Sequence, residues 1–170
     1  MAELMARMAE IAVSRHESDV LVALGLGSCI GVALLDRASP VAGLAHVVLP
    51  ESRPGSPTPG KFADTAVPEL LRQLTGLGAT KARLHAVLVG GAQMFTAGAG
   101  GALDIGRRNE QAVRTALAVA GVPITTTLTG GGAGRTMRVH IGSGLVTCKQ
   151  AGSQEETIAT RDAGRLRAAA

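Results

Sequence analysis

The stretch GLGSCIGVALLDRASPVAGLAHVVLP, residues 25–50, holds two apolar runs separated by the polar segment DRASP, with a cysteine in the first run and a histidine in the second. The first run, residues 29–35, is typical of a buried strand. The segment at 36–40 predicts a hairpin turn, so the second run, residues 41–49, returns beside the first. Antiparallel pairing would then bring Cys29 and His46 to the same end of the ribbon.

Two interpretations of Cys29 and His46 stay open from the residues alone. Cysteine is among the most buried residue types, so both side chains could simply pack in a core. Alternatively, Cys29 is a nucleophile and His46 its base, and Cys29 would then react with iodoacetamide at a lower pH than a free thiol does. The glycine-rich turn favours chemistry, because backbone N–H groups around Gly27 and Ser28 could stabilise an oxyanion. Cys148 lacks such a setting and is expected to be structural.

The rest of the chain alternates between short apolar runs and two amphipathic segments. Helices are predicted at residues 61–74 and 105–120, and Pro68 is expected to kink or restart the first of them. Residues 90–101 predict a glycine-rich connection, and residues 51–60 a proline-rich loop. We expect one domain over residues 1–149, with a flexible segment at 1–9 and a polar tail at 150–170 that is partly helical or disordered. Strands are predicted at residues 10–14, 20–24, 83–89, 123–128, 136–141 and 145–149.

Composition excludes several classes of protein. Of the 170 residues 46% are hydrophobic, but no run is long enough to span a membrane and the N-terminus lacks the apolar core of a signal peptide. We therefore expect a soluble, cytoplasmic protein with reduced thiols. The formal charge of +4 comes from dispersed residues with almost no aromatics beside them, which argues against nucleic-acid binding. Four histidines and two cysteines show no metal-ligand spacing, so neither a metal nor another cofactor is expected.

Six motifs, in order along the chain, resemble those of the CheD family, the chemoreceptor glutamine deamidases of bacterial and archaeal chemotaxis. Together they cover roughly residues 13–149. They are LGLGSCIGVALLD (24–36), GLAHVVLP (43–50), KFADTAVPELL (61–71), VGGAQMF (89–95), IGRRN (105–109) and GGGAGR (130–135).

The resemblance implies an α+β fold, a β-sandwich-like core flanked by helices, similar to the bacterial toxin-type cysteine deamidases. It implies a protein-glutamine glutaminase that hydrolyses receptor glutamine side-chain amides to glutamate. Cys29 matches the family nucleophile and His46 the family base, and glutamate methyl esters could enter the same cycle. The implied partners are methyl-accepting chemotaxis receptors and a CheC-type phosphatase. A monomer without membrane insertion is the default expectation.

The chain departs from the family pattern at two places. Ala23 stands where the family usually has a threonine that completes a triad-like set, and we hypothesise that the backbone carbonyl of Ala23 orients the imidazole instead. Leu128 and Thr129 stand where the family often has an acidic residue. Two alternatives therefore stay open: a catalytically weak or inactive module that docks to receptors or a phosphatase, and an unrelated thiol hydrolase of small amides.

Overall fold

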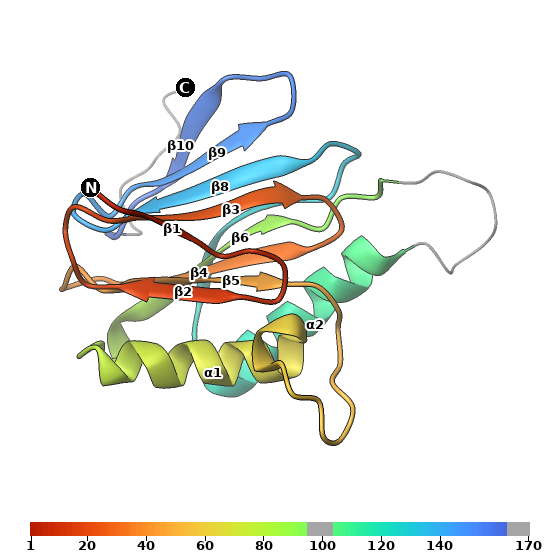
Figure 1. Cartoon of the computed structure of the whole chain (residues 1–170), viewed down its shortest axis with the longest axis horizontal. Coiled ribbons are helices and arrows are strands. Elements are labelled where there is room, and N and C mark those ends of the chain that lie inside the picture. The colour runs from red at the N-terminus through yellow and green to blue at the C-terminus, as the bar shows by residue number, and fades with distance from the viewer. Residues whose placement is uncertain (95–103, 163–170) are drawn as a thin grey trace.

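The structure is a computed structural model that describes residues 1–94 and 104–162. Its strands form two five-stranded sheets, stacked face to face in Figure 1. The outer sheet has the order β1 (Glu3–Met5), β3 (Val20–Leu26), β8 (Arg135–His140), β9 (Val146–Gln150), β10 (Glu155–Ala159). The central sheet has the order β2 (Ile11–Ser14), β5 (Ala42–Val47), β4 (Ile30–Asp36), β6 (Leu84–Gly90), β7 (Ile124–Thr129).

Two helices cover the face of the central sheet that points away from the outer sheet (Figure 1). They are α1 (Ala63–Gly76) and α2 (Ile105–Ala120), and short 3₁₀ turns, η1 (Pro59–Lys61) and η2 (Lys81–Arg83), precede α1 and β6. The predicted α+β sandwich flanked by helices is thus confirmed, with both helices on one side. Helix α2 has the predicted bounds, and α1 runs through Pro68 as one helix rather than restarting there.

Strand β4 is buried on both faces, which explains the unbroken apolar run that the sequence presents. Successive side chains of a strand point to opposite faces. Ile30, Val32 and Leu34 accordingly pack toward the helices, whereas Ala33 and Leu35 pack toward the outer sheet. A strand enclosed in this way needs apolar residues at every position, so alternation is absent from its sequence.

Gly31 sits directly opposite His46 in the pairing of β4 with β5. A side chain at this position would meet the outer sheet, because an added Cβ would lie 2.9 Å from Leu26 Cδ1 and 3.0 Å from Met137 Sδ. The glycine therefore lets the two sheets approach each other closely next to the histidine.

Both ends of the described chain hold strands that the sequence analysis did not predict. Residues 1–9 were expected to be flexible, but β1 pairs in parallel with β3. The tail was expected to be helical or disordered, but β10 pairs with β9 at the edge of the outer sheet. Both strands are short and largely exposed, so they lack the apolar signal of an enclosed strand. Residues 95–101 of the predicted glycine-rich connection and residues 163–170 of the tail lie outside the described residues.

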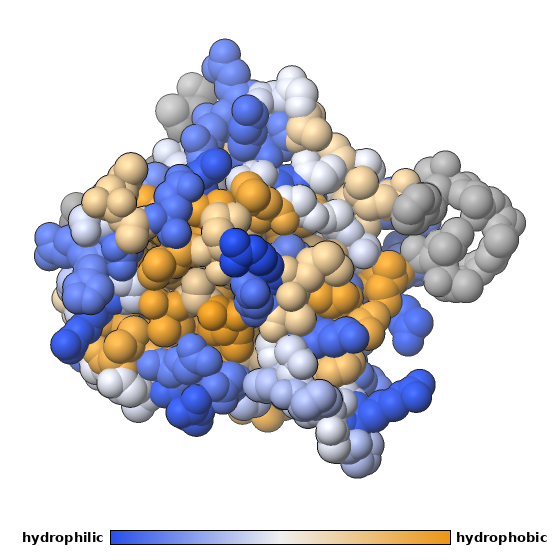
Figure 2. Space-filling view, in the orientation of Figure 1, coloured by the Kyte–Doolittle hydropathy of each residue, from blue (hydrophilic) through white to orange (hydrophobic). Residues whose placement is uncertain are grey.

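The surface is apolar where the edges of the two sheets come forward. Figure 2 shows apolar side chains gathered over the middle of this face, with hydrophilic ones above and below them. None of the helices within residues 1–94 and 104–162 has the length and apolar character that a membrane crossing requires.

Strand β4 ends at an ion pair with a buried carboxylate, far along the strand from Cys29. Asp36 is fully buried and accepts hydrogen bonds from Arg83 Nε and Nη2, both at 2.9 Å. The backbone N–H groups of Ala38 and Thr80 also donate to it. Burial opposes ionisation of this carboxyl, but its hydrogen bonds and the charge of Arg83 outweigh that effect and lower its pKa to about 2.

We expect Asp36→Asn to lower the free energy of unfolding by about 2–4 kcal/mol, because it leaves Arg83 and the N–H groups of Ala38 and Thr80 without their charged acceptor. Urea unfolding of the purified variant measures this. The matched control is Glu69→Gln, which removes a helical ion pair with the largely exposed Arg72 and should cost less than about 1 kcal/mol. Equal losses in the two variants would contradict the prediction.

Candidate active site

Cys29 and His46 lie on the same face of the central sheet, in the interior between the two sheets. Cys29 immediately precedes β4, and His46 lies in β5 opposite Gly31. Cys29 is two residues from Gly31, so its side chain shares that face and lies diagonally across from His46. Diagonal neighbours in antiparallel strands are about 7–8 Å apart between their Cα atoms, within reach of long side chains. The structure thus places the two residues predicted from the hairpin on one face of the sheet, diagonally opposite each other.

The imidazole of His46 has one nitrogen fixed and one nitrogen available. Its Nδ1 lies 3.0 Å from the backbone carbonyl of Ala6. A carbonyl only accepts hydrogen bonds, so Nδ1 carries the proton and Nε2 keeps its lone pair. The ring is almost completely buried, and Nε2 has no hydrogen-bond partner among the described residues. His46 is therefore held in the tautomer that can accept a proton at Nε2.

The carbonyl that orients His46 belongs to Ala6, so the hypothesis that assigned this role to Ala23 is wrong. Ala6 follows β1, is fully buried, and donates its own N–H to Val22 O at 2.8 Å. Ala23 is also fully buried, but it lies within β3 and pairs with Met137 of β8. The parallel strand β1 brings the Ala6 carbonyl to the histidine, and nothing in the sequence marked that strand.

Burial keeps both members of the pair neutral in the free protein. Burial raises the pKa of the Cys29 thiol, and a hydrogen bond from the backbone N–H of Cys29 to its own sulfur offsets this only in part. Burial also lowers the pKa of His46, against the opposing effects of the Ala6 carbonyl and Glu10. The lowered thiol pKa expected of a catalytic cysteine is therefore absent. The two neutral groups instead share one face of the sheet, and a neutral imidazole is the form that can act as a base.

The turn that precedes Cys29 is tied to its neighbours through its carbonyl groups. Gly27 O accepts from Ala92 N at 2.8 Å, and Cys29 O accepts from Gly91 N at 2.9 Å. Gly90 belongs to the same contact, because its φ is +120° and an added Cβ would lie 2.1 Å from Cys29 O. The glycine-rich motif at residues 89–95 could be recognised in the sequence, but the sequence did not show that this motif contacts the turn before Cys29.

The backbone N–H groups of the same turn, in contrast, make no hydrogen bonds to other residues within the described parts of the chain. Within residues 1–94 and 104–162, no carbonyl or side chain of another residue accepts from the N–H groups of Gly27, Ser28 or Cys29. Backbone N–H groups that have no acceptor in another residue can bind the negative charge that forms on a carbonyl oxygen during acyl transfer. This arrangement supports the predicted oxyanion role for the turn.

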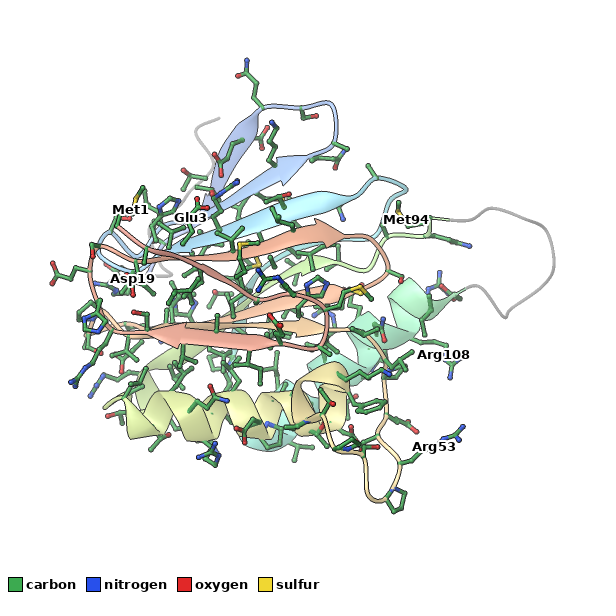
Figure 3. The ribbon with its side chains drawn as sticks, viewed as in Figure 1. Met1, Glu3, Asp19, Arg53, Met94 and Arg108 are labelled. Atoms are coloured by element: carbon green, nitrogen blue, oxygen red, sulfur yellow. The ribbon has the colours of Figure 1, made fainter. Side chains whose placement is uncertain are left out.

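Apolar side chains border the turn on its solvent side. Leu24 and Met94 are 52% and 46% exposed. An added Cβ on Gly27 would lie 3.1 Å from Met94 Cγ, so Met94 packs directly on the turn. Figure 3 shows Met94 beyond the end of β6, at the end of the sandwich where residues 95–103 begin. A substrate segment that reaches Cys29 from this side would meet an apolar surface.

A hollow lies elsewhere, between the two helices. It has a volume of about 660 Å³ and is lined by residues of α1 and α2 together with Pro50 and Glu51, without Cys29 or His46. Arg108, labelled in Figure 3, belongs to its wall. The candidate site, a buried pair next to the turn at residues 25–28, is therefore separate from this hollow.

Comparisons with known proteins identify relatives over most of the chain. Residues 48–150 match the family model described as CheD chemotactic sensory transduction. Proteins named "Probable chemoreceptor glutamine deamidase CheD" are similar to this chain in Methanococcus vannielii (40% identity, 86% of this chain and 94% of that one) and Clostridium novyi (43%, 78% and 83%). The protein of that name in Symbiobacterium thermophilum is 40% identical, over 89% of this chain and 94% of its own. The match to the Methanococcus vannielii protein covers 86% of this chain, so the segment that it spans includes Cys29 and His46.

Proposed function

This chain belongs to the CheD family, and on that premise we propose that it is a chemoreceptor glutamine deamidase, with Cys29 as nucleophile and His46 as base. The observation that carries this assignment is the tautomer of His46. Its Nδ1 is bonded to the Ala6 carbonyl and its Nε2 is buried and unpartnered, on the same face as Cys29. A histidine that merely filled the core would be expected to satisfy both ring nitrogens.

The first half of the reaction is acyl transfer to Cys29. His46 Nε2 takes the thiol proton as the sulfur attacks the side-chain amide carbon of a receptor glutamine, and a C–S bond forms. The amide oxygen gains negative charge and accepts hydrogen bonds from the N–H groups of Ser28 and Cys29. The C–N bond then breaks, and the His46 imidazolium gives its proton to the departing ammonia. A thioester remains.

The second half releases glutamate. His46 Nε2 takes a proton from water as the water oxygen attacks the thioester carbon. The C–S bond breaks, the sulfur leaves as thiolate and regains its proton from the imidazolium, and the glutamate carboxyl is free. A glutamate methyl ester could follow the same path, with methanol in place of ammonia.

Ala23 does not remove the support of the histidine in this proposal. Without a threonine hydroxyl at position 23, Nδ1 of His46 still has a hydrogen-bond partner, because it donates to the Ala6 carbonyl. We therefore infer that the chain is active without a hydroxyl at position 23. The alanine at the family's threonine position is the observation that favours the second candidate, a docking module that binds receptors or a CheC-type phosphatase without chemistry.

The proposed substrates are glutamines exposed on the cytoplasmic helices of methyl-accepting chemotaxis receptors, which would place the protein in the cytoplasm. Leu24 and Met94 are suited to contact the apolar side of such a helix beside its target glutamine. A CheC-type phosphatase is the proposed second partner, and a monomer is the default state.

The test uses the cytoplasmic fragment of a chemoreceptor from the same organism. After incubation with the protein, receptor peptides are examined by mass spectrometry for the mass gain that marks an amide converted to an acid, and binding is measured in parallel. Conversion of particular glutamines supports the deamidase. Binding without conversion at any glutamine would make the chain a docking module, and neither binding nor conversion would contradict both candidates.

The pH dependence of deamidation should reflect the burial of His46. Because burial lowers the pKa of this imidazole below its ordinary value of 6.5, the ring stays neutral until the pH falls below that value. We expect kcat/KM to be level near neutral pH and to decline only below pH 6.5, with an apparent pKa that belongs to the Cys29–His46 pair.

The control for this profile is His85→Gln. The pKa of His85 is also lowered by burial, but both of its ring nitrogens have partners, Thr125 Oγ1 and Arg161 O. This variant should keep the acid limb of the wild type. An acid limb centred above pH 7 in the wild type would contradict the neutral-pair account.

A further inference from the structure

Asn109 is a buried amide that links the turn before Cys29 to the strand that carries His46. It lies in the first turns of α2 and is fully buried. Its Nδ2 donates to Ser28 O and to Val48 O, both at 2.9 Å. Both neighbours are carbonyl oxygens, which only accept, so the amide must present its NH₂ group to them.

The first of these bonds acts on the peptide that supplies the N–H group of Cys29. Ser28 C=O and Cys29 N–H belong to one planar trans peptide and point in opposite directions. When Asn109 holds the oxygen toward α2, the Cys29 N–H points the other way, toward its own thiol, which accepts from it. A hydrogen bond to the carbonyl also polarises the amide and strengthens its N–H as a donor.

The second bond fixes this peptide relative to the base. Val48 lies two residues after His46, at the position across from Cys29 when the β4–β5 register is continued. One NH₂ group therefore joins the two chain segments that carry nucleophile and base, at a point next to both.

The remaining atom of the amide argues against a simple packing role. Asn109 Oδ1 is buried and has no hydrogen-bond partner within the described residues. An unpaired buried acceptor destabilises the fold, and an aliphatic side chain of similar size would avoid that cost. The Nδ2 group of Asn109 thus binds the carbonyl groups of Ser28 and Val48, while its Oδ1 has no hydrogen-bond partner within the described residues.

We propose that Asn109 is a positioning residue that holds the Ser28–Cys29 peptide so that the Cys29 N–H stabilises the oxyanion during acyl transfer. The proposal rests on the proposed function, since it concerns the same site. It predicts that loss of Asn109 impairs reactions that build an oxyanion and spares reactions at the same sulfur that do not.

The test compares two reactions of Cys29 in a Cys148→Ala background, where Cys29 is the remaining thiol of the chain. In acylation by p-nitrophenyl acetate, a C–S bond forms, the carbonyl oxygen gains negative charge, and p-nitrophenolate leaves. In alkylation by iodoacetamide, a C–S bond forms and iodide leaves, and no carbonyl oxygen gains charge. Cys29→Ala supplies the background rate for each reagent, and p-nitrophenolate release and intact mass follow the two reactions.

We expect Asn109→Ala to slow acylation by about 10–100-fold, part of the effect of losing an oxyanion donor, while alkylation changes little. Asn109→Leu fills the same space without hydrogen-bond donors, so it should slow acylation as Asn109→Ala does. It replaces the alanine variant if that variant is unstable, and thermal unfolding measures the stability of both. Gln111→Ala, an exposed amide of the same helix, is the matched control. Unchanged acylation, or a parallel loss of acylation and alkylation, would overturn the proposal. Because neither reagent involves a receptor, these results are independent of whether receptor deamidation is found.

Discussion

Replacing Cys29 with alanine is expected to abolish receptor deamidation, with a loss on the order of 10⁴-fold or more, because the proposed thioester forms on the Cys29 sulfur. Cys29→Ser should be almost as inactive. The pKa of His46 is already lowered by burial, and this weak base would have to deprotonate an alcohol in place of a thiol. Single-turnover assays of glutamate formation on the receptor fragment, with enzyme in excess, measure both variants.

The matched control for Cys29 is Cys148→Ala. Cys148 is buried in β9, where it pairs with Met137 of β8, and burial raises its pKa as it does that of Cys29. Its strand partners are Met137 and Glu156, and it lies in a regular strand rather than after a glycine-rich turn, so its removal should leave deamidation unchanged. Activity that survives in Cys29→Ala but is lost in Cys148→Ala would show that the nucleophile had been assigned to the wrong thiol.

Replacing His46 with alanine is expected to lower kcat by about 10²–10⁴-fold. Without the Nε2 lone pair, the thiol of Cys29 must lose its proton to water, and its raised pKa makes that unfavourable near neutral pH. The residual activity should increase as the pH rises toward the pKa of the thiol, in contrast to the level profile of the wild type. Measurement of kcat across the pH range tests both statements.

His85→Gln again provides the comparison, since it removes a buried imidazole whose two nitrogens are both bonded. It should affect stability more than kcat. A His46→Ala variant with wild-type kcat would mean that another group acts as the base. If both variants lose activity together with the fold, the pH profile of the wild type decides whether His46 is the base. A decline only below pH 6.5 supports that role, and an acid limb centred above pH 7 contradicts it.

The hairpin and α2 could be predicted because their signals are local. The register of β4 with β5 follows from a five-residue turn and two enclosed strands, and it is this register that places Cys29 and His46 on one face. The bounds of α2 follow from its apolar spacing and from Gly121, which ends the helix with a φ of +74°. These features depend on residues near each other in sequence.

The supports of the site could not be predicted because they come from far along the chain. The Ala6 carbonyl is forty residues from His46, and a backbone carbonyl carries no residue-specific signal. The assignment to Ala23 was wrong for this reason: it followed a family position, whereas the contact depends on the pairing of β1 with β3. Asn109 is 81 residues from Ser28, so its motif could be noticed but its two acceptors could not be named.

The most direct test of the central claim, that Cys29 forms a thioester with a glutamine side chain, is receptor deamidation in the presence of hydroxylamine. Hydroxylamine competes with water for the thioester and leaves a glutamyl hydroxamate, which peptide mass spectrometry separates from glutamate by its greater mass. We predict that the wild type yields both products at the same glutamines and that the hydroxamate fraction rises with hydroxylamine concentration. Conversion to glutamate alone at high hydroxylamine concentration, or conversion by Cys29→Ala, would contradict the account.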